Sequence, residues 1–127
     1  MEKDCIFCNI DKEKVILRND SFIAVMDEFP VSDGHMLIIS RRHIDNIFEL
    51  TMNEAESLQL MIVEAKRYIM SHWHPDGFNI GCNCGEAAGQ TMMHFHMHVI
   101  PRYNGDVKNP RGGVRGVIPN KRNYSVN

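Results

Sequence analysis

The sequence predicts an α+β domain built on a mostly antiparallel sheet. Two observations support this prediction. Several apolar or alternating segments of strand length are separated by short polar turns, and one long segment with helical periodicity lies between them. Strands that follow one another through short turns pair in an antiparallel manner, and a single long helix can cover one face of the sheet that they form.

The composition is that of one soluble globular domain. The 127 residues are enough for one hydrophobic core, and 43% hydrophobic with 24% charged residues is ordinary for such a domain. A formal net charge of −2 gives no electrostatic reason to expect nucleic-acid or membrane binding. No apolar run approaches the roughly 20 residues that span a bilayer. The first residues lack the layout of a signal peptide, so we expect a cytoplasmic protein whose cysteines are thiols or metal ligands.

The first half of the chain predicts a short turn followed by three strands. Residues 5–10 contain a C-x-x-C pair and apolar residues at helical spacing, which predicts an amphipathic turn. Residues 15–18 and 21–27 predict two strands joined at a turn formed by Asn19 and Asp20. Residues 35–40 form an apolar run of strand length.

Residues 51 to about 73 predict the one long helix. Thr51 and Glu54 have the T-x-x-E spacing of a capping box, in which each side chain bonds a free amide at the helix start. An apolar stripe follows the helical period and predicts a core-facing side, comprising Leu58, Met61, Ile62, Ala65, Tyr68 and Ile69. Residues 78–83 predict a further strand, which contains Cys82 and leads to Cys84; both are expected to be plain thiols.

Residues 92–100 alternate histidines with large apolar residues, which predicts a half-buried strand. His94, His96 and His98 would then share one face, roughly 6.5–7 Å apart, with the apolar residues packed in the core. Imidazole can bind a metal, transfer a proton or attack as a nucleophile. The preceding small-residue loop, 85–91, would let backbone approach an anion closely. Together they indicate a phosphate that faces a histidine.

Residues 94–100 resemble the H-φ-H-φ-H-φ-φ signature of the histidine triad (HIT) family of nucleotide hydrolases and transferases, where φ is an apolar residue. The resemblance extends to the upstream loop and to residues 27–43, and so covers most of the chain up to about Arg102. It implies a five-stranded antiparallel sheet with one long and one or more short helices, continued across a homodimer. It also implies a purine nucleotide as the substrate.

The resemblance assigns the catalytic roles. It implies that His96 attacks the α-phosphate and forms a nucleotidyl-histidine intermediate, which water hydrolyses. His98 would contact the phosphate oxygens and share the proton transfer, and His35 would support it. The implied substrate contacts are as follows: Asp27 binds the ribose hydroxyls, Asn83 the phosphate and sugar, Gly89, Gln90 and Thr91 the phosphate or leaving group, and Ile6, Phe7 and Ile10 the base. Core packing explains the last three equally well.

A second candidate site is a zinc site. Cys5 and Cys8 have the spacing of a zinc half-site, and zinc takes four ligands in tetrahedral geometry. Resemblance to zinc-containing HIT proteins and to galactose-1-phosphate uridylyltransferases implies His43 and His94 as the other two. Such a structural zinc would tie the N-terminal turn to the catalytic strand. Against it, a lone C-x-x-C is common and many family members lack the metal.

Residues 102–127 predict an extended basic arm within a single HIT domain of residues 1–127. The segment has six basic residues against one acid, Asp106, together with prolines and a Gly112-Gly113 pair. An arm of this kind could wrap a partner subunit or contribute arginines to a phosphate site. A solvated tail is an equally good interpretation.

The sequence leaves the substrate class open. The C-x-x-C start resembles Hint-like members, which cleave nucleoside phosphoramidates, whereas Gly89-Gln90-Thr91 and the residues after His98 resemble the fragile-histidine-triad branch, which cleaves dinucleoside polyphosphates. A nucleotide-binding or scaffold module with incidental catalysis is the alternative from another class, and the intact triad speaks against it. A zinc finger that reads nucleic acid is a third, disfavoured hypothesis, because His43 and His94 lie far outside the spacing of a finger and the net charge is acidic.

Overall fold

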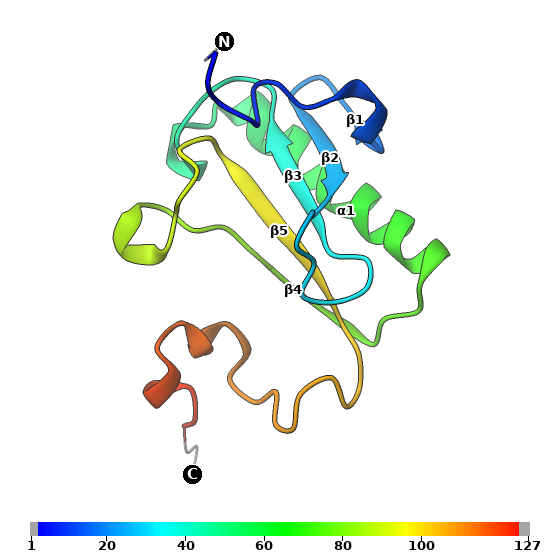
Figure 1. Cartoon of the computed structure of the whole chain (residues 1–127), viewed down its shortest axis with the longest axis vertical. Helices are drawn as coiled ribbons and strands as arrows, with labels where there is room; N and C mark the ends of the chain where they lie inside the picture. Colours follow the sequence, from blue (N-terminus) through cyan, green and yellow to red (C-terminus); the bar gives the residue numbers. More distant parts are fainter. Residues whose placement is uncertain (1–2, 125–127) are drawn as a thin grey trace.

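The computed structural model describes residues 3–124 and has one five-stranded antiparallel sheet with the order β1-β2-β3-β5-β4 (Figure 1). The strands are β1 (Leu17–Arg18), β2 (Phe22–Met26), β3 (Met36–Ser40), β4 (Gly77–Gly81) and β5 (His96–Arg102). Every pair of neighbouring strands is antiparallel. The predicted fold class is therefore confirmed.

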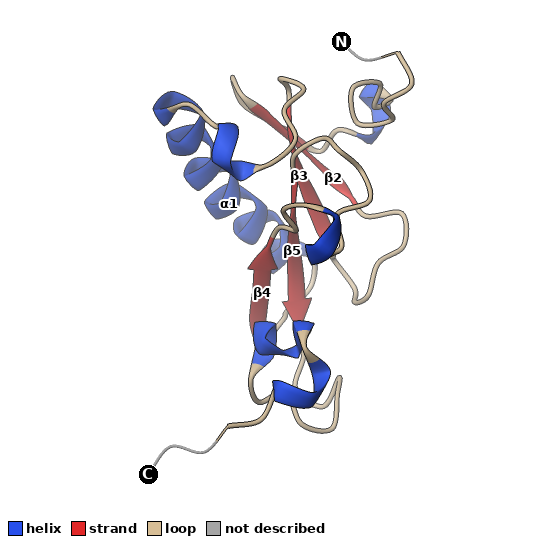
Figure 2. Cartoon of the chain, turned by 90° about the vertical axis from the view of Figure 1, so that its left-hand side faces the viewer, coloured by secondary structure: helices blue, strands red, loops and turns tan. Residues whose placement is uncertain are grey.

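The one long helix, α1 (Met52–His72), lies against one face of the sheet (Figure 2). Its start has the predicted capping box: the Thr51 hydroxyl accepts from the Glu54 amide at 3.1 Å, and the Glu54 carboxylate accepts from the Thr51 amide at 2.9 Å. The Arg42 guanidinium also bonds Glu54 and, with the Thr51 amide, lowers the pKa of that carboxyl to about 2. Leu58, Met61, Ala65 and Ile69 are the helix residues buried against the sheet.

Residues 3–124 also contain five short 3₁₀ helices. They are η1 (Lys12–Lys14), η2 (Ile47–Glu49), η3 (Glu86–Ala88), η4 (Gly113–Val117) and η5 (Pro119–Lys121). No helix among residues 3–124 is long and apolar enough to cross a membrane.

The two faces of the sheet bury different residues. The face under α1 forms the main core and includes Phe95, Met97 and Val99, as the alternation in the histidine segment predicted. The opposite face carries a smaller apolar cluster of Val25, Leu37 and Ile39, covered by residues of the N-terminal segment. Because β3 lies in the centre of the sheet with both faces covered, all five of its residues are buried. The second face is the one that holds the candidate site.

Two predicted strands, 92–100 and 78–83, differ most from the observed ones, and pairing with the neighbouring strand sets the observed ends. The histidine strand begins at His96 rather than at residue 92, because its neighbour β3 ends at Ser40 and the last pair between them is Ile39 with His96. It then continues to Arg102, where it pairs with Gly77. The strand predicted at 78–83 spans Gly77–Gly81 instead, so Cys82 and Cys84 lie in the loop that follows it.

The C-terminal arm carries two 3₁₀ helices, η4 and η5, and lies beyond the ends of β4 and β5 (Figures 1 and 2). The guanidinium groups of Arg111 and Arg115 each lie 4.9 Å from the ring centre of Tyr124. Arg115 also donates to the carbonyl oxygens of Lys121 and Arg122 at 2.8 and 3.2 Å. The described part of the arm, residues 102–124, therefore has internal contacts, and the remainder of the predicted arm lies outside the described residues.

Candidate active site and metal cluster

The largest cavity described, about 620 Å³, lies on the face of the sheet away from α1. Sheet register builds its floor, since Val25 pairs with Leu37 and Leu37 pairs with His98. The lining residues predicted from the sequence are Ile6, Phe7, Ile10, Asp27, Thr91, His96 and His98. The structure thus places most of the expected nucleotide-contacting residues around one space with apolar walls and histidines at one side.

His96 has a defined tautomer. Its Nδ1 lies 2.9 Å from the backbone carbonyl oxygen of His94. A carbonyl oxygen can only accept, so Nδ1 carries the proton and the neutral ring keeps a lone pair on Nε2. An imidazole in this state is prepared to act as a nucleophile or base through Nε2.

His35, His98 and Asp27 form a connected group beside His96. The Val31 amide donates to His35 Nδ1 at 3.1 Å, so neutral His35 carries its proton on Nε2. That nitrogen lies 2.9 Å from His98 Nδ1 and 3.3 Å from the Asp27 carboxylate. When His98 Nδ1 accepts the hydrogen bond from His35 Nε2–H, neutral His98 carries its own proton on Nε2. It can then donate a hydrogen bond from Nε2 to a bound anion.

Burial favours the neutral forms of these two rings. His35 is only 2% exposed, and burial lowers the pKa of His35 although Asp27 opposes the shift. Burial also lowers the pKa of His98, and the neighbouring His35 and His96 lower it further. Both rings are therefore neutral near pH 7. Asp27 and His35 lie together because they end the β2–β3 connection, where the Asp27 amide donates to the His35 carbonyl at 3.0 Å.

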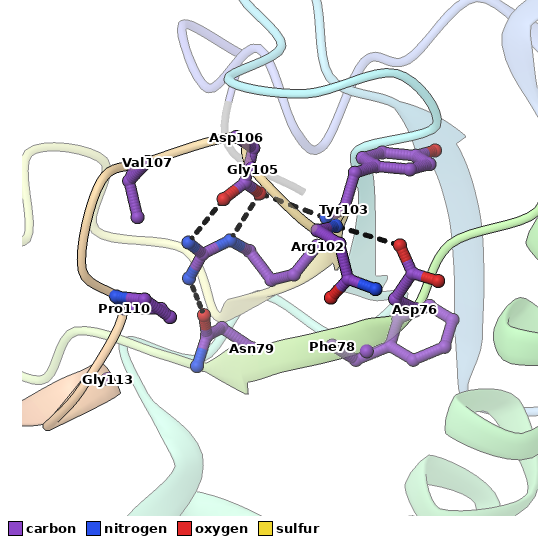
Figure 3. Close-up of a pocket in the computed structure, with 12 residues that line it drawn as sticks. Asp76, Phe78, Asn79, Arg102, Tyr103, Gly105, Asp106, Val107, Pro110 and Gly113 are labelled. Carbon is purple, nitrogen blue, oxygen red and sulfur yellow. Dashed lines mark hydrogen bonds and ion pairs between the residues drawn. The ribbon is translucent and has the colours of Figure 1, made fainter.

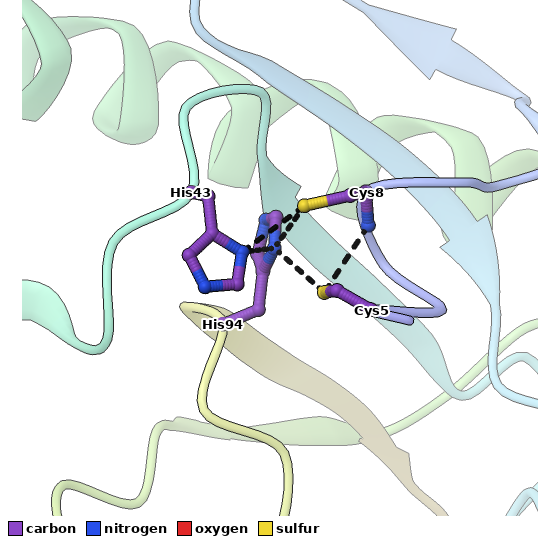
Figure 4. A group of neighbouring side chains, drawn as sticks. All are labelled: Cys5, Cys8, His43 and His94. Carbon is purple, nitrogen blue, oxygen red and sulfur yellow. Dashed lines mark hydrogen bonds between the residues drawn. The ribbon is translucent and has the colours of Figure 1, made fainter. Parts of the chain in front are cut away.

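The second cluster joins Cys5, Cys8, His43 and His94 (Figure 4), and all four ligand atoms lie within 4.8 Å of one another. Cys8 Sγ lies 3.0 Å from His43 Nδ1, and Cys5 Sγ lies 3.3 Å from His94 Nδ1. The two Nδ1 atoms are 3.1 Å apart. A tetrahedral zinc site would separate its ligands by roughly 3.3–3.7 Å, so this cluster is close to the required spacing.

The hydrogen bonds around the two clusters distinguish a metal site from a proton relay. His94 Nε2 lies 2.7 Å from the Ser40 carbonyl oxygen, so it must donate there, and Nδ1 is left as a lone pair that faces the sulfurs. Asp27, His35 and His98 are also close enough to hold an ion. There, however, the Val31 amide places the His35 proton on Nε2, the atom that a metal would need. The cluster of Cys5, Cys8, His43 and His94 therefore fits zinc. The group of Asp27, His35 and His98 fits a hydrogen-bonded relay.

The predicted loop residues lie differently from the cavity residues. Gln90 is buried, and its side-chain amide donates to the carbonyl oxygens of Asp45 and Met92 at 2.6 and 3.0 Å. Its side-chain oxygen accepts from the Gly85 amide at 2.8 Å. The Gln90 amide was expected to face the phosphate. In this structure the Gln90 side chain instead bonds backbone groups and holds the loop together. Asn83 and Gly89 are exposed and do not line the cavity, so their contacts with a substrate stay predictions.

Some residues that border the cavity were not anticipated from the sequence. Lys14, Glu28 and Phe29 line it together with the floor residues Val25 and Leu37. No local pattern marks the floor residues, because only the strand order places them beside His98. Glu28 and Phe29 directly follow Asp27, and this proximity in the sequence was the available signal.

Cys82 and Cys84 are free thiols, as expected. Burial and the adjacent Cys84 raise the pKa of Cys82 to about 11. A thiol with such a pKa is almost entirely protonated near neutral pH and is a poor nucleophile.

A smaller cavity of about 280 Å³ lies between the arm and the ends of β4 and β5 (Figure 3). Arg102 donates twice to Asp106, at 2.8 Å each, and once to Asn79 at 2.6 Å. The Asp76 carboxylate accepts from the Asn104 amide at 2.7 Å. These hydrogen bonds hold the start of the arm against the end of the sheet.

A comparison with known proteins finds a family model and relatives that match most of this chain. A family model described as HIT domain matches residues 9–105. The protein named "Protein hit" of Bacillus subtilis is 35% identical over 105 residues, which are 80% of this chain and 72% of that protein. The "AP-4-A phosphorylase" of Mycobacterium tuberculosis is 34% identical over 93 residues, which are 72% of this chain and 48% of that protein.

Solved structures share the fold as well. The crystal structure of a zinc-bound histidine triad family protein from Mycobacterium smegmatis matches with a TM-score of 0.74 at 31% identity. The match covers 84% of this chain and 80% of that one.

Proposed function

Because this chain belongs to the histidine triad (HIT) family, we propose that it hydrolyses purine nucleoside 5′-phosphate derivatives at the α-phosphate through His96. The observation that carries the proposal is the bond between His96 Nδ1 and the His94 carbonyl oxygen, at 2.9 Å. It leaves Nε2 with a lone pair at the edge of a cavity of nucleotide size. The name of the Mycobacterium tuberculosis relative, a phosphorylase of AP-4-A, agrees with nucleotide chemistry.

The reaction has two steps. His96 Nε2 attacks the α-phosphorus, the bond from phosphorus to the leaving group breaks, and a nucleotidyl-histidine forms. Water then attacks the same phosphorus, the bond to His96 breaks, and a nucleoside monophosphate leaves. The His98 Nε2–H would stabilise charge on the phosphate oxygens, and the His35 Nε2–H, 2.9 Å from His98 Nδ1, would hold His98 in this tautomer.

The cavity supports binding of the nucleoside part. Phe7 and Ile10 supply apolar walls for the base, and Asp27, which also lines the cavity, lies beside His35 and His98. Asp27 Oδ1 accepts from the Phe29 amide at 2.7 Å, and a carboxylate oxygen has a second lone pair for a ribose hydroxyl.

The leaving group is tested by a direct comparison. The rates of hydrolysis of adenosine 5′-phosphoramidate and of a diadenosine polyphosphate are measured side by side on one preparation. We expect hydrolysis of at least one. A preference of about tenfold or more in kcat/KM, or roughly 1.4 kcal/mol, would assign the chain to the phosphoramidase or the dinucleotide branch. If neither is hydrolysed while nucleotides still bind, the proposed reaction is wrong, and the chain is a nucleotide-binding or scaffold module.

We propose in addition that Cys5, Cys8, His43 and His94 hold a structural zinc. The spacing of the four ligand atoms and the His94 tautomer support it, as does the zinc-bound structural neighbour. When bound, zinc would supply folding energy by joining the N-terminal turn to the segment before β5. It would also hold His94, whose carbonyl oxygen orients His96.

We also propose that each chain is a single domain of residues 1–127 and that two chains form a homodimer with a continuous sheet. β4 supports this because it lies at one edge of the sheet, where its outer backbone groups can pair with another strand. Sedimentation equilibrium at micromolar concentration should give twice the chain mass of 14.6 kDa. A monomer mass under these conditions would contradict the dimer.

A cytoplasmic location is proposed because none of the four cysteines is in a disulfide, which suits a reducing compartment. Cell fractionation would test it.

A further inference from the structure

The candidate cavity has two chemically different ends. His96 and His98 lie on β5, and β3 and then β2 follow it across the sheet. The floor runs from His98 through Leu37 to Val25. Neighbouring strands lie ~4.8 Å apart, so this floor extends roughly 10 Å from the histidine strand. A ligand whose phosphate contacts the histidines would place its other end near β2.

Lys14 and Glu28 lie at that other end. Glu28 comes two residues after Met26, the last residue of β2, and Lys14 precedes β1, which pairs with β2 on its outer side. Lys14 Nζ donates to Glu28 Oε1 at 2.8 Å, and both residues line the cavity. The Glu28 carboxylate raises the pKa of Lys14, so this lysine is a cation at neutral pH.

Two other polar residues at this end bond the N-terminal segment itself. The Asn9 side chain donates to the carbonyl oxygens of Lys3 and Cys5. The Asp11 carboxylate accepts from the Glu13 amide at the start of η1. The Lys14–Glu28 pair differs, because it joins two segments that both border the cavity.

We propose that the Lys14–Glu28 pair recognises the edge of the nucleobase and favours guanine over adenine. The inference rests on the proposed function, because that function places a purine nucleotide in this cavity. Phe7 and Ile10 would contact the faces of the base, while the ion pair would contact its polar edge.

The donor and acceptor pattern of the two purines supports this choice. A carboxylate only accepts hydrogen bonds and has two oxygens, whereas an ammonium group only donates. Guanine presents two neighbouring donors, N1–H and the 2-amino group, beside the acceptor O6. Glu28 can therefore accept twice from guanine while Lys14 donates to O6. Adenine has a single amino donor beside the acceptor N1, so it would make one bond fewer with Glu28.

The expected preference is modest because the pair is exposed. The side chains of Lys14 and Glu28 are 59% and 67% exposed. Water competes for hydrogen bonds at such positions, and we expect GMP to bind about fivefold more tightly than AMP.

Calorimetry with GMP, AMP and inosine monophosphate tests the proposal on the wild-type chain and on Glu28→Gln and Lys14→Met. The expected order of affinity is GMP, inosine monophosphate, AMP, because inosine lacks only the 2-amino group. Glu28→Gln should bring the ratio between GMP and AMP close to one, and Lys14→Met should weaken GMP more than AMP. Glu13→Gln is the matched control, since Glu13 is exposed on η1 and does not line the cavity.

Equal affinity of the wild-type chain for GMP and AMP would overturn this inference. A ratio that is unchanged in Glu28→Gln would overturn it as well, and so would the binding of neither nucleotide. Binding is measured without turnover, so the two proposals fail separately. A chain that prefers GMP through Glu28 but hydrolyses no nucleotide derivative would contradict the proposed function and leave base recognition in place.

Discussion

His96→Ala should lower kcat/KM for the better of the two test substrates by at least about 10³-fold, which corresponds to roughly 4 kcal/mol of transition-state stabilisation. The variant lacks the only atom that the proposed mechanism uses to attack phosphorus. The neighbouring His98 cannot replace it. Its Nδ1 accepts from His35 at 2.9 Å, so its Nε2 carries a proton and has no lone pair with which to attack. Steady-state kinetics on the purified variant measures the loss.

Two further measurements make this result specific. His74→Ala is the matched control, because His74 is exposed after the end of α1, and it should retain wild-type turnover. The His96→Ala variant should still bind a nucleoside monophosphate, since the apolar walls and Asp27 remain. Wild-type turnover by His96→Ala would exclude the covalent mechanism altogether.

Cys8→Ser should lose the bound metal and lower the free energy of unfolding by several kcal/mol, on the order of 3–5. Cys8 Sγ lies within 3.4 Å of the Nδ1 atoms of both His43 and His94, so its removal breaks the cluster at its centre. Elemental analysis of protein purified without added metal should give close to one zinc per wild-type chain and close to none for the variant. Denaturant unfolding measures the change in stability.

Cys84→Ser provides the control for this experiment. Cys84 is partly buried like Cys8 but lies outside the metal cluster, so its substitution should leave the zinc content unchanged. Wild-type protein that contains no zinc and unfolds at the same denaturant concentration as Cys8→Ser would exclude this ligand set.

Several features of this chain follow from local sequence. The Thr51–Glu54 capping box spans only four residues, and its two hydrogen bonds need no distant partner. Alternation in the histidine segment correctly separates Phe95, Met97 and Val99, which enter the core, from the histidines. This works because side chains of a strand point to opposite faces in turn.

Other predictions depended on partners far away in the chain, and the local pattern could not supply them. The first residue of β5 is set by where β3 ends, not by where the alternation begins. Gln90 was expected to face a phosphate, yet its amide bonds the carbonyl oxygen of Asp45, which lies 45 residues earlier. Such bonds depend on which loops the fold brings together.

By itself, the sequence determined the fold class and the family. It also identified the histidines and cysteines that could act in catalysis or bind a metal. These are encoded in periodicity and spacing over short stretches. Only the tertiary structure decided the proton positions and the surroundings of these groups. The Val31 amide places the proton of His35, the Ser40 carbonyl turns the His94 lone pair toward Cys5 and Cys8, and strand order brings Lys14 and Glu28 to the cavity. The physical reason is that a tautomer depends on the partner of each ring nitrogen, and that partner is chosen by the packing of distant segments.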